Sequence, residues 1–163
     1  MSAATRAIAV ATEAGIAFRV HEYAHERGVT AWGTEAAAAL GVEANRVFKT
    51  LVVDTSDALV VAVVPVESEL DLKALARATG SKHARMAEPA IAERATGYVV
   101  GGISPLGQRQ QMSIVVDDSA RGHDTLYVSA GRRGLEIELG PDDLVMLTGG
   151  RYAAIARPTT KSS

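Results

Sequence analysis

Residues Val47 to Val64 read VFKTLVVDTSDALVVAVV, and this stretch indicates the fold class of the whole chain. Two runs rich in β-branched residues, Val47 to Asp54 and Ala58 to Val64, flank the polar turn Thr55-Ser56-Asp57. Short β-branched runs separated by a polar turn are typical of a β-hairpin. We therefore expect two neighbouring antiparallel strands here.

One residue of the first run does not suit a buried strand. Side chains alternate between the two faces of a strand, so Lys49 shares a face with Val47, Leu51 and Val53. Lysine is almost never fully buried unless it is paired. The stretch alone leaves two interpretations open. Lys49 either lines a pocket that receives an anionic group, or lies on an edge strand and points to water, where it prevents aggregation.

Helix and strand patterns alternate on both sides of the hairpin, without a repeat or a linker. The predicted helices are Ala4 to Ala14, Thr30 to Leu40, Asp71 to Gly80, Pro89 to Ala95 and Pro141 to Leu147. The further predicted strands are Ile16 to Tyr23, Tyr98 to Val100, Met112 to Val116, Thr125 to Ser129, Leu135 to Leu139 and Tyr152 to Ala156. Hairpins mixed with scattered helices predict an α+β fold in which a mixed sheet curls around one core. We expect one domain over residues 1–157 and a disordered tail over residues 158–163.

Composition narrows the possible functions. The 163 residues are 47% hydrophobic and 22% charged, which is ordinary for a single globular domain, and no apolar run reaches about 18 residues. We therefore expect a cytoplasmic protein with no membrane association. The absence of cysteine excludes disulfides, thiolate metal sites and a thiol nucleophile on the protein. With a net charge of −2, the chain lacks the excess of basic residues that is typical of proteins that bind nucleic acid strongly by themselves. Any nucleic acid must therefore be bound locally or with the help of a partner.

The segment His21-Glu22-Tyr23-Ala24-His25 matches the HExxH pattern of zinc proteases. That pattern binds zinc only on a helix, where residues four apart lie on one face. Residues Ile16 to Tyr23 instead alternate with a period of two, which predicts a strand, and strand positions four apart stand about 13 Å from each other. We therefore expect two surface histidines and no metal site. Tyr23 shares a face with Arg19 and His21 and is a candidate pocket residue.

A glycine-rich segment, Gly97 to Gln108, reads GYVVGGISPLGQ. Glycine pairs let the backbone approach a ligand closely and present unpaired N–H groups, which can form an oxyanion hole. Many such segments are simple turns, and that interpretation stays open. The segment lacks the GxxxxGK[ST] pattern of a phosphate loop. Ser104 lies outside any GxSxG nucleophile pattern and is followed by Pro105.

Taken together, these segments resemble the YbaK family of aminoacyl-tRNA editing proteins, relatives of the editing insertion domain of prolyl-tRNA synthetase. The resemblance extends from about residue 4 to residue 157. The segments that carry it are Tyr23, Phe48-Lys49-Thr50, Leu70 to Lys73, Thr96 to Gly107, Tyr127 to Gly131 and Arg133 to Leu139. It implies a mixed, partly barrel-like sheet flanked by helices, in agreement with the α+β prediction. It also implies the hydrolysis of mischarged tRNA, best known in this family for Cys-tRNA(Pro).

The resemblance also implies which residues form the site. Lys49 matches the conserved strand lysine, and Gly101 and Pro105 match the GxxxP signature, so that Lys49, Gly101 and Gly102 are the candidate catalytic residues. The candidate substrate-binding residues are Tyr23, Trp32 (where phenylalanine is usual), Thr50, Ser104, Pro105, Ser129 and Glu136. Glu136 stands where the family usually has aspartate. Alternation places Glu136 and Glu138 on one face of their strand, and plain exposure of both to solvent is the other interpretation.

The residue types indicate that the substrate supplies its own nucleophile. Without cysteine, a serine elbow or a metal cluster, the chain offers no evident group to attack an ester. A cysteinyl thiol held near its own ester carbonyl gains the high effective molarity of an intramolecular reaction. We expect no cofactor, and mischarged tRNA(Pro) and prolyl-tRNA synthetase as partners. Two alternatives stay open: an Ala- or Ser-tRNA deacylase of the same family, or a module that binds tRNA or a synthetase without turnover.

Overall fold

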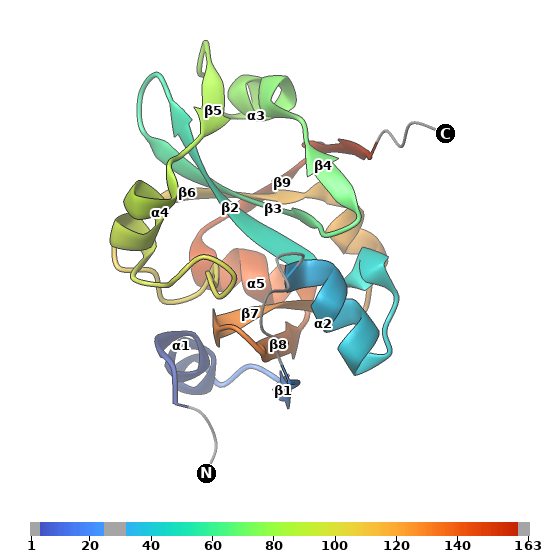
Figure 1. Ribbon diagram of the computed structural model, residues 1–163. Helices are drawn as coiled ribbons and strands as arrows, with labels where there is room; N and C mark the ends of the chain where they lie inside the picture. The colour runs from blue at the N-terminus through green and yellow to red at the C-terminus, as the bar shows by residue number, and fades with distance from the viewer. Residues whose placement is uncertain (1–3, 25–31, 160–163) are drawn as a thin grey trace.

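The structure of the chain is a computed structural model that describes residues 4–24 and 32–159, with only the backbone of Trp32 and Gly33. The described helices are α1 (Arg6–Ala14), α2 (Trp32–Leu40), α3 (Leu72–Thr79), α4 (Pro89–Thr96) and α5 (Pro141–Thr148), with the 3-10 helices η1 (Ala44–Arg46) and η2 (Asp118–Gly122). The described strands are β1 (Phe18–Glu22), β2 (Phe48–Thr55), β3 (Leu59–Pro65), β4 (Ser68–Leu70), β5 (Ala84–Met86), β6 (Ser113–Asp117), β7 (Leu126–Arg132), β8 (Leu135–Leu139), β9 (Arg151–Ala153) and β10 (Ala156–Pro158). Figure 1 shows the helices arranged around the strands.

The larger sheet has five strands in the order β5-β2-β3-β6-β9. Strands β2 and β3 form the predicted antiparallel hairpin, in register from Phe48 opposite Pro65 to Asp54 opposite Leu59. Strand β5 joins β2 antiparallel, whereas β3 pairs with β6 and β6 with β9 in parallel. The sheet is therefore mixed, as the sequence predicts.

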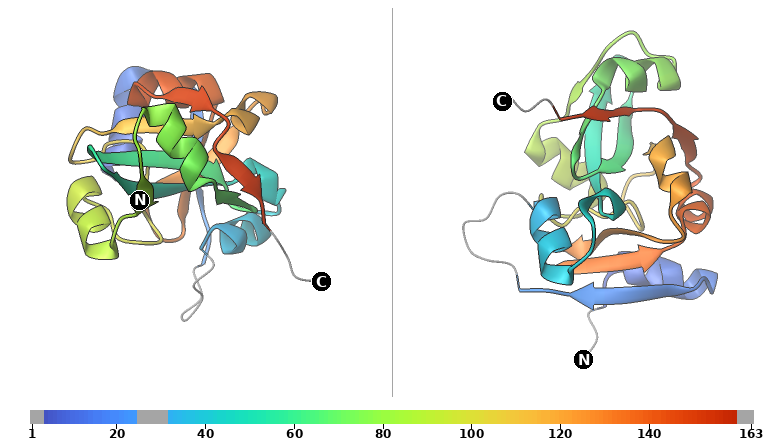
Figure 2. Two further views of the ribbon diagram at one scale, coloured as in Figure 1. Left: turned by 90° about the horizontal axis from the view of Figure 1, so that it is seen from above. Right: turned by 90° about the vertical axis from the view of Figure 1, so that its right-hand side faces the viewer.

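A smaller antiparallel sheet has the order β1-β8-β7, and a two-stranded sheet joins β10 to β4. An isolated parallel bridge between Val47 and Tyr127 connects the smaller sheet to the start of β2. The right-hand view of Figure 2 shows this smaller sheet at the end of the molecule opposite α3. The strands described do not close into a barrel. The partly barrel-like sheet that the resemblance implies corresponds instead to two separate sheets that meet at this one bridge.

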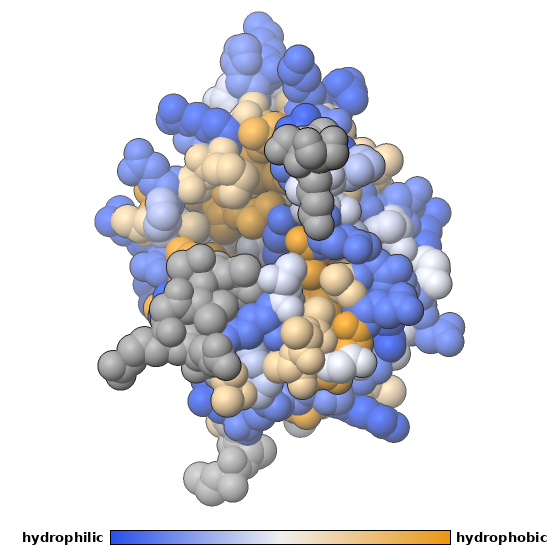
Figure 3. Space-filling view, turned by 45° about the vertical axis from the view of Figure 1, so that its right-hand side comes forward, coloured by the Kyte–Doolittle hydropathy of each residue, from blue (hydrophilic) through white to orange (hydrophobic). Residues whose placement is uncertain are grey.

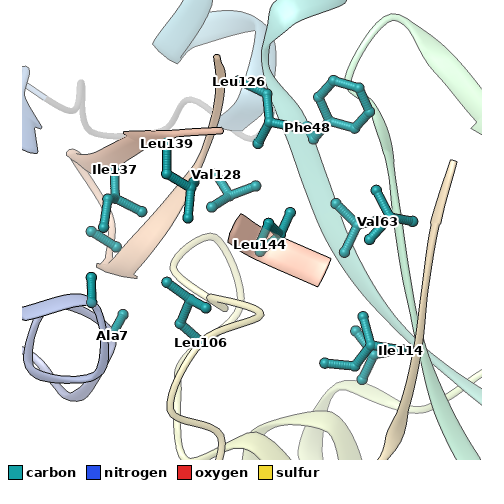
Figure 4. Close-up of a cluster of buried hydrophobic side chains, with 14 of the residues drawn as sticks. Ala7, Phe48, Val63, Leu106, Ile114, Leu126, Val128, Ile137, Leu139 and Leu144 are labelled. Carbon is teal, nitrogen blue, oxygen red and sulfur yellow. The ribbon is translucent and has the colours of Figure 1, made fainter. Parts of the chain in front are cut away.

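The main core lies between the two sheets, where α1, α4, α5 and the glycine-rich loop also contribute side chains (Figure 4). Phe48 and Leu144 are among its largest buried residues. A second cluster, which includes Val53 and Leu75, lies on the other face of the larger sheet beneath α3. Full burial of one such side chain stabilises the fold by about 1.5–3 kcal/mol. Because β2 contributes to both clusters, its two faces are fixed, and the residues between its core positions are held in place.

The helix ends follow the capping signals in the sequence. Helix α3 begins after Asp71, whose carboxylate accepts the amide of Ala74 at 3.0 Å, and ends at Gly80 in the left-handed conformation. Helices α1 and α4 end at Gly15 and Gly97 in the same way. These local signals explain why the predicted helices agree with the structure to within a few residues.

Several predicted boundaries are wrong. Residues Tyr98 to Val100, predicted as a strand, form a bend and a turn, because α4 ends at Gly97 and the chain must reverse there. The predicted strand Tyr152 to Ala156 is instead the end of β9 and the start of β10. The tail predicted from Pro158 begins inside β10, where Pro158 lies opposite Ser68 of β4. Residues 160–163 lie outside the described part of the chain.

Within the described residues, none of the helices is both long and apolar enough to span a lipid bilayer.

Candidate active site

A cavity of about 510 Å³ lies where β2, α4, the glycine-rich loop and the smaller sheet meet. Its polar lining residues are Tyr23, Thr34, Lys49, Thr50, Ser129 and Glu136. Its remaining lining residues are Val47, Phe48, Leu51, Val52, Val66, Met86, Ala87, Pro89, Ala92, Val100, Gly101 and Ile103. Figure 3 shows apolar residues around a hollow on this side of the molecule. An apolar cavity with a few convergent polar groups is typical of a small-molecule or substrate site.

Lys49 lies on β2 and lines this cavity. It shares a face with Leu51 and Val53, as predicted, and both of these pack in the second core cluster. Strand β2 has an open edge at Lys49, because β5 pairs only with Val53 to Thr55. The lysine is nevertheless partly buried, and among the described residues its ammonium has no hydrogen-bond or ion-pair partner. Lys49 therefore brings a positive charge without a direct partner among the described residues to the wall of an apolar cavity.

Burial lowers the pKa of Lys49 below its ordinary value, and the nearby carboxylate of Glu69 partly opposes this shift. An anion that entered the cavity would stabilise the ammonium and raise that pKa again. The geometry thus favours the pocket interpretation of Lys49 over that of a lysine directed into solvent.

Thr50, the next residue of β2, points to the opposite face and also lines the cavity. Its hydroxyl oxygen is buried and has no hydrogen-bond partner. A buried hydroxyl without a partner is unfavourable by about 1–3 kcal/mol. Such a group is therefore poised to hydrogen-bond to a ligand that fills the cavity.

Glu136 lies on β8, between Ser129 of β7 and His21 of β1 in the smaller sheet. Its side chain is only 7% exposed, so solvent exposure, the other interpretation open from the sequence, does not apply. Burial raises the pKa of Glu136 from 4.5 to about 8. Near neutral pH the carboxyl group is therefore mostly protonated, and among the described residues it has no hydrogen-bond partner. The neighbouring Ser129 also faces the cavity.

Tyr23 follows β1 and is held by a hydrogen bond from its amide to the carbonyl of Gly134, 2.9 Å long. Burial, with smaller contributions from the carboxylates of Glu136 and Glu35, raises the pKa of Tyr23 to about 12. The phenol therefore stays protonated and can act as a hydrogen-bond donor in the cavity.

The glycine-rich loop enters the cavity through a tight turn over residues 99–102. The amide of Gly102 donates to the carbonyl of Val99 at 2.8 Å, and Gly101 has φ +90°, which a type II turn requires at that position. The carboxylate of Glu93 accepts the amide of Val100 at 2.9 Å, and Arg133 donates to the carbonyl of Val100 at 2.9 Å. The turn is thus held from both sides.

This arrangement determines which backbone donors are free. The amides of Gly101 and Ile103 have no hydrogen-bond partner among the described residues, and both residues line the cavity. The amide of Gly102 is engaged in the turn. Of the two residues predicted to supply oxyanion donors, Gly101 has a free amide and Gly102 does not, and the other free amide belongs to Ile103, a residue that the sequence did not single out.

Three predicted site residues do not line the cavity. Gly102 packs against the backbone of Arg132 and leaves no room for a side chain. Ser104 is fully buried, and its hydroxyl accepts the amide of Leu106 at 3.2 Å. Pro105 is buried beside it. These residues shape the loop rather than contact the cavity. The side chain of Trp32 lies outside the described part of the chain.

Some cavity residues could not be identified from the sequence. Val66 follows β3, and Met86 and Ala87 lie at the end of β5, a strand too short for its alternation to be recognised. Thr34 of α2 has no motif around it. Each reaches the cavity only through the packing of distant elements.

Glu138 shares the face of Glu136 but belongs to a separate polar network. Its carboxylate accepts hydrogen bonds from Thr125 at 2.6 Å and pairs with His21 at 2.9 Å and Arg46 at 3.6 Å. Although burial opposes this, the hydrogen bonds from Thr125 and His21 hold the pKa of Glu138 below its ordinary value. This network ties η1 to β1, β8 and Thr125, the residue before β7, so Glu138 is not simply exposed to solvent.

The HExxH segment begins in a strand, as predicted, and leaves it at Tyr23, so none of its described residues is helical. His21 and Glu22 belong to β1, and His25 lies outside the described residues. No group of three or more His, Cys, Asp and Glu residues within the described chain could hold a metal ion. His21 is instead bound to Glu138.

The cavity therefore combines an ammonium, two free backbone donors and a buried carboxyl group. The lining residues described include no cysteine, histidine or aspartate. Such a site can bind and polarise an ester. Its lining hydroxyl groups are weak nucleophiles unless a base activates them, and Glu136 is mostly protonated near neutral pH and is therefore not a ready base.

Comparisons with known proteins agree with this description. A family model described as the aminoacyl-tRNA editing domain matches residues 25–147. The protein EbsC of Enterococcus faecalis, assigned as a Cys-tRNA(Pro)/Cys-tRNA(Cys) deacylase, is 44% identical over 126 residues, or 77% of this chain and 75% of that protein. A solved structure assigned as a trans-editing enzyme for prolyl-tRNA synthetase has a TM-score of 0.82 at 25% identity, covering 96% of this chain and 99% of the other. The hypothetical protein APE2540 has a TM-score of 0.84 at 26% identity, covering 94% and 100%.

Proposed function

The chain belongs to the aminoacyl-tRNA editing domain family, and we propose that it is a deacylase that hydrolyses mischarged tRNA in trans, with Cys-tRNA(Pro) as its substrate. The observation that carries this proposal is the cavity itself, which presents Lys49 and the free amides of Gly101 and Ile103, but no cysteine or histidine among its described lining residues. A site of this kind suits a substrate that carries its own nucleophile.

Each polar group of the cavity can be matched to a part of an aminoacyl ester. The ammonium of Lys49 binds the terminal nucleotide or its phosphate, and the amides of Gly101 and Ile103 stabilise the oxyanion that forms on the ester carbonyl. The carboxyl group of Glu136 complements the α-ammonium group of the amino acid and ionises when that cation binds. Tyr23, Thr50 and Ser129 provide hydroxyl groups for the ribose and the ester.

The proposed reaction begins with the thiol of the bound cysteinyl group. The thiol loses its proton, its sulfur bonds to the ester carbonyl carbon, and the tetrahedral intermediate expels the ribose oxygen, which takes up a proton. The products are a tRNA with free terminal hydroxyl groups and a cyclic thioester, which water then hydrolyses to free cysteine. Attack within one molecule reaches effective molarities of about 10⁵–10⁸ M when the groups are well aligned. The protein then needs only to fold the cysteinyl group back and stabilise the developing charge.

We place this activity in the cytoplasm, with tRNA(Pro) and prolyl-tRNA synthetase as partners in a ternary complex. The net charge of −2 supports the need for a partner, since a strong autonomous tRNA binder would carry an excess of basic residues.

Deacylation of Ala- or Ser-tRNA remains the second candidate, favoured by one observation. The hydroxyl groups of Thr50 and Ser129 line the cavity and are possible partners for a water molecule, which would attack the ester of a substrate without a thiol. A module that binds tRNA without turnover is less consistent with the ammonium of Lys49 and the loop amides of Gly101 and Ile103, which have no hydrogen-bond or ion-pair partner in the described part of the chain.

The proposal is tested by a deacylation assay on tRNA charged with Cys, Ser, Ala or Pro. We expect release of cysteine from Cys-tRNA(Pro) and stable Pro-tRNA(Pro). Faster release of alanine than of cysteine would transfer the assignment to the second candidate. Binding of all four tRNAs without any release would identify a binding module.

A further inference from the structure

The segment Leu72–Ala87, which forms α3 and β5, is the most basic part of the chain and is called here the basic segment. It contains Lys73, Arg77, Lys82 and Arg85 and no Asp or Glu. Since the whole chain has a net charge of −2, the residues outside this segment carry a net charge of −6. A local positive region on an otherwise acidic protein is a physical feature that attracts anions.

These cations are exposed and mostly unneutralised. Lys73, Arg77 and Lys82 are exposed and have no ion-pair partner among the described residues. Arg85 is 83% exposed and is paired with Asp54 at 3.4 Å, a weak contact at the surface. The guanidinium of Arg151, from β9, donates to the carbonyl of Ala78 at 2.6 Å and brings a further cation to the end of α3.

The positive charges of Lys73 and Arg77 do little to stabilise helix α3. Ala74, Leu75 and Ala76 bury the inner face of the helix, whereas Lys73 and Arg77 project outward four residues apart. Like charges at this spacing destabilise a helix by about 0.2–0.5 kcal/mol. Lys73 also lies in the first turn, where the helix dipole disfavours a cation. Only Arg77, in the last turn, is favoured by the dipole.

The C-terminal end of the basic segment lines the cavity. Met86, at the end of β5, lines the cavity and follows Arg85 in the chain. Lys82 lies four residues before Met86, so their Cα atoms are at most about 14 Å apart. Figure 1 and the right-hand view of Figure 2 show α3 and β5 together at one end of the molecule. A strand of RNA whose aminoacylated end entered the cavity could therefore pass along the basic segment.

We infer that the basic segment is the surface that binds the phosphates of the tRNA acceptor end, with Lys73, Arg77 and Lys82 as the contacting residues. This inference rests on the proposed function, because it takes the aminoacylated end of a tRNA as the occupant of the cavity. The contacts are electrostatic and do not read the sequence, so they add affinity for any tRNA acceptor end.

The test compares two triple variants that remove the same charge. The first is Lys73→Gln, Arg77→Gln and Lys82→Gln, and the matched control replaces the exposed Arg94, Arg109 and Arg121 with glutamine. Each is assayed on Cys-tRNA(Pro) and on a cysteinyl ester of adenosine, which lacks the rest of the RNA. We expect the first triple to lower kcat/KM on the tRNA by about tenfold or more near 0.15 M salt. The slope of log kcat/KM against log salt should become less steep by about 2–3, which corresponds to three lost phosphate contacts.

Turnover of the adenosine ester should stay within about twofold of wild type in both variants. If the control triple loses tRNA activity and the first triple does not, the RNA lies on another face and the inference is wrong. If the first triple slows the adenosine ester equally, the substitutions disturb the cavity and the inference is also wrong. The single variant Lys82→Gln, outside any helix or strand, gives the same comparison if the triple variant does not fold.

A second measurement separates this inference from the proposed function. Binding of an uncharged acceptor-stem hairpin with a single-stranded 3′ end is measured at several salt concentrations. If wild type releases no amino acid from any tRNA, the proposed function fails. Selective weakening of hairpin binding in the first triple would still support the basic segment as an RNA surface, and equal binding by all three proteins would overturn it.

Discussion

Gly102 lies directly against the backbone of Arg132. A Cβ atom built on Gly102 would be 2.7 Å from the Arg132 Cα and 2.9 Å from the Arg133 nitrogen, closer than real Cβ atoms come to other atoms. The backbone at the junction of β7 and β8 therefore packs directly against the glycine-rich loop and limits where the loop can lie. Since the turn that ends at Gly102 presents the amides of Gly101 and Ile103, this contact sets where those two donors point.

Replacing Gly102 with alanine should displace the loop and reduce activity. Loss of one oxyanion donor costs about 10²–10³ in kcat, and we expect Gly102→Ala to lower the single-turnover rate by that much. The matched control is Gly122→Ala, where an added Cβ meets nothing within 4 Å. A Gly102→Ala variant as active as the control would show that the loop amides take no part in the reaction.

Lys49 should be needed for activity and not for folding. Replacement by methionine keeps an apolar stem of similar length and removes a charge that has no partner among the described residues. We expect Lys49→Met to have a Tm equal to or above that of wild type, because a partly buried charge is lost. Its kcat/KM on aminoacyl-tRNA should fall by at least about tenfold. The exposed Arg94→Met provides the control, and full activity of Lys49→Met would contradict the role proposed for Lys49.

The fold was largely predictable because its signals are local. The hairpin of β2 and β3 is marked by β-branched runs and a polar turn, and α3 by its cap Asp71 and its terminal Gly80. Strands β4 and β5 could not be predicted, because each has only three residues and is defined by its pairing with distant strands. Residues Tyr98 to Val100 show the converse error, since a short apolar run can pack in a turn as well as in a strand.

The site was predictable only where strand alternation or the family resemblance applied. Alternation placed Lys49 on the correct face, and it placed Glu136 and Glu138 together. It could not indicate that Glu136 is buried while Glu138 lies in a polar network, since this depends on what packs over the smaller sheet. For the same reason the sequence did not reveal the unpartnered hydroxyl of Thr50.

Thr50 offers a test that separates binding from folding. Replacing Thr50 with valine removes a buried hydroxyl that has no partner. We expect the free energy of unfolding to stay unchanged or to rise by about 1 kcal/mol. If the hydroxyl binds substrate, KM for aminoacyl-tRNA should rise in the same variant. Denaturant unfolding and steady-state kinetics measure the two effects, and a strongly destabilised variant would mean that the hydroxyl has a partner within the fold.

Glu136 should make stability depend on pH. Its pKa is about 8 in the folded protein and 4.5 as an ordinary carboxyl, so the folded state retains a proton that the unfolded state loses. The stabilisation is complete below about pH 4.5 and is lost as the pH rises through about 8. Glutamine cannot ionise, so the Tm of Glu136→Gln minus that of wild type should increase between pH 5 and 8.5. A constant difference would mean that Glu136 titrates normally.

The final prediction concerns the thiol of the substrate. If the protein only positions the ester and stabilises its oxyanion, the rate must follow the nucleophile that the aminoacyl group carries. Serine differs from cysteine by one atom and fits the same cavity, but its hydroxyl is a poor nucleophile when no base activates it. A thiol is a few per cent thiolate near pH 7 and intrinsically very nucleophilic.

We therefore expect single-turnover release from Cys-tRNA(Pro) to be far faster than from Ser- or Ala-tRNA(Pro), with a cyclic thioester formed from the cysteine substrate alone. Gly122→Ala should leave this order unchanged, and Gly102→Ala should slow the cysteine reaction without changing its product. The contrast between cysteine and serine is chemical and not steric, so a difference in KM alone would not satisfy the prediction. Equal rates for cysteine and alanine would indicate attack by a water molecule bound in the cavity, and the substrate would then be Ala-tRNA rather than Cys-tRNA(Pro).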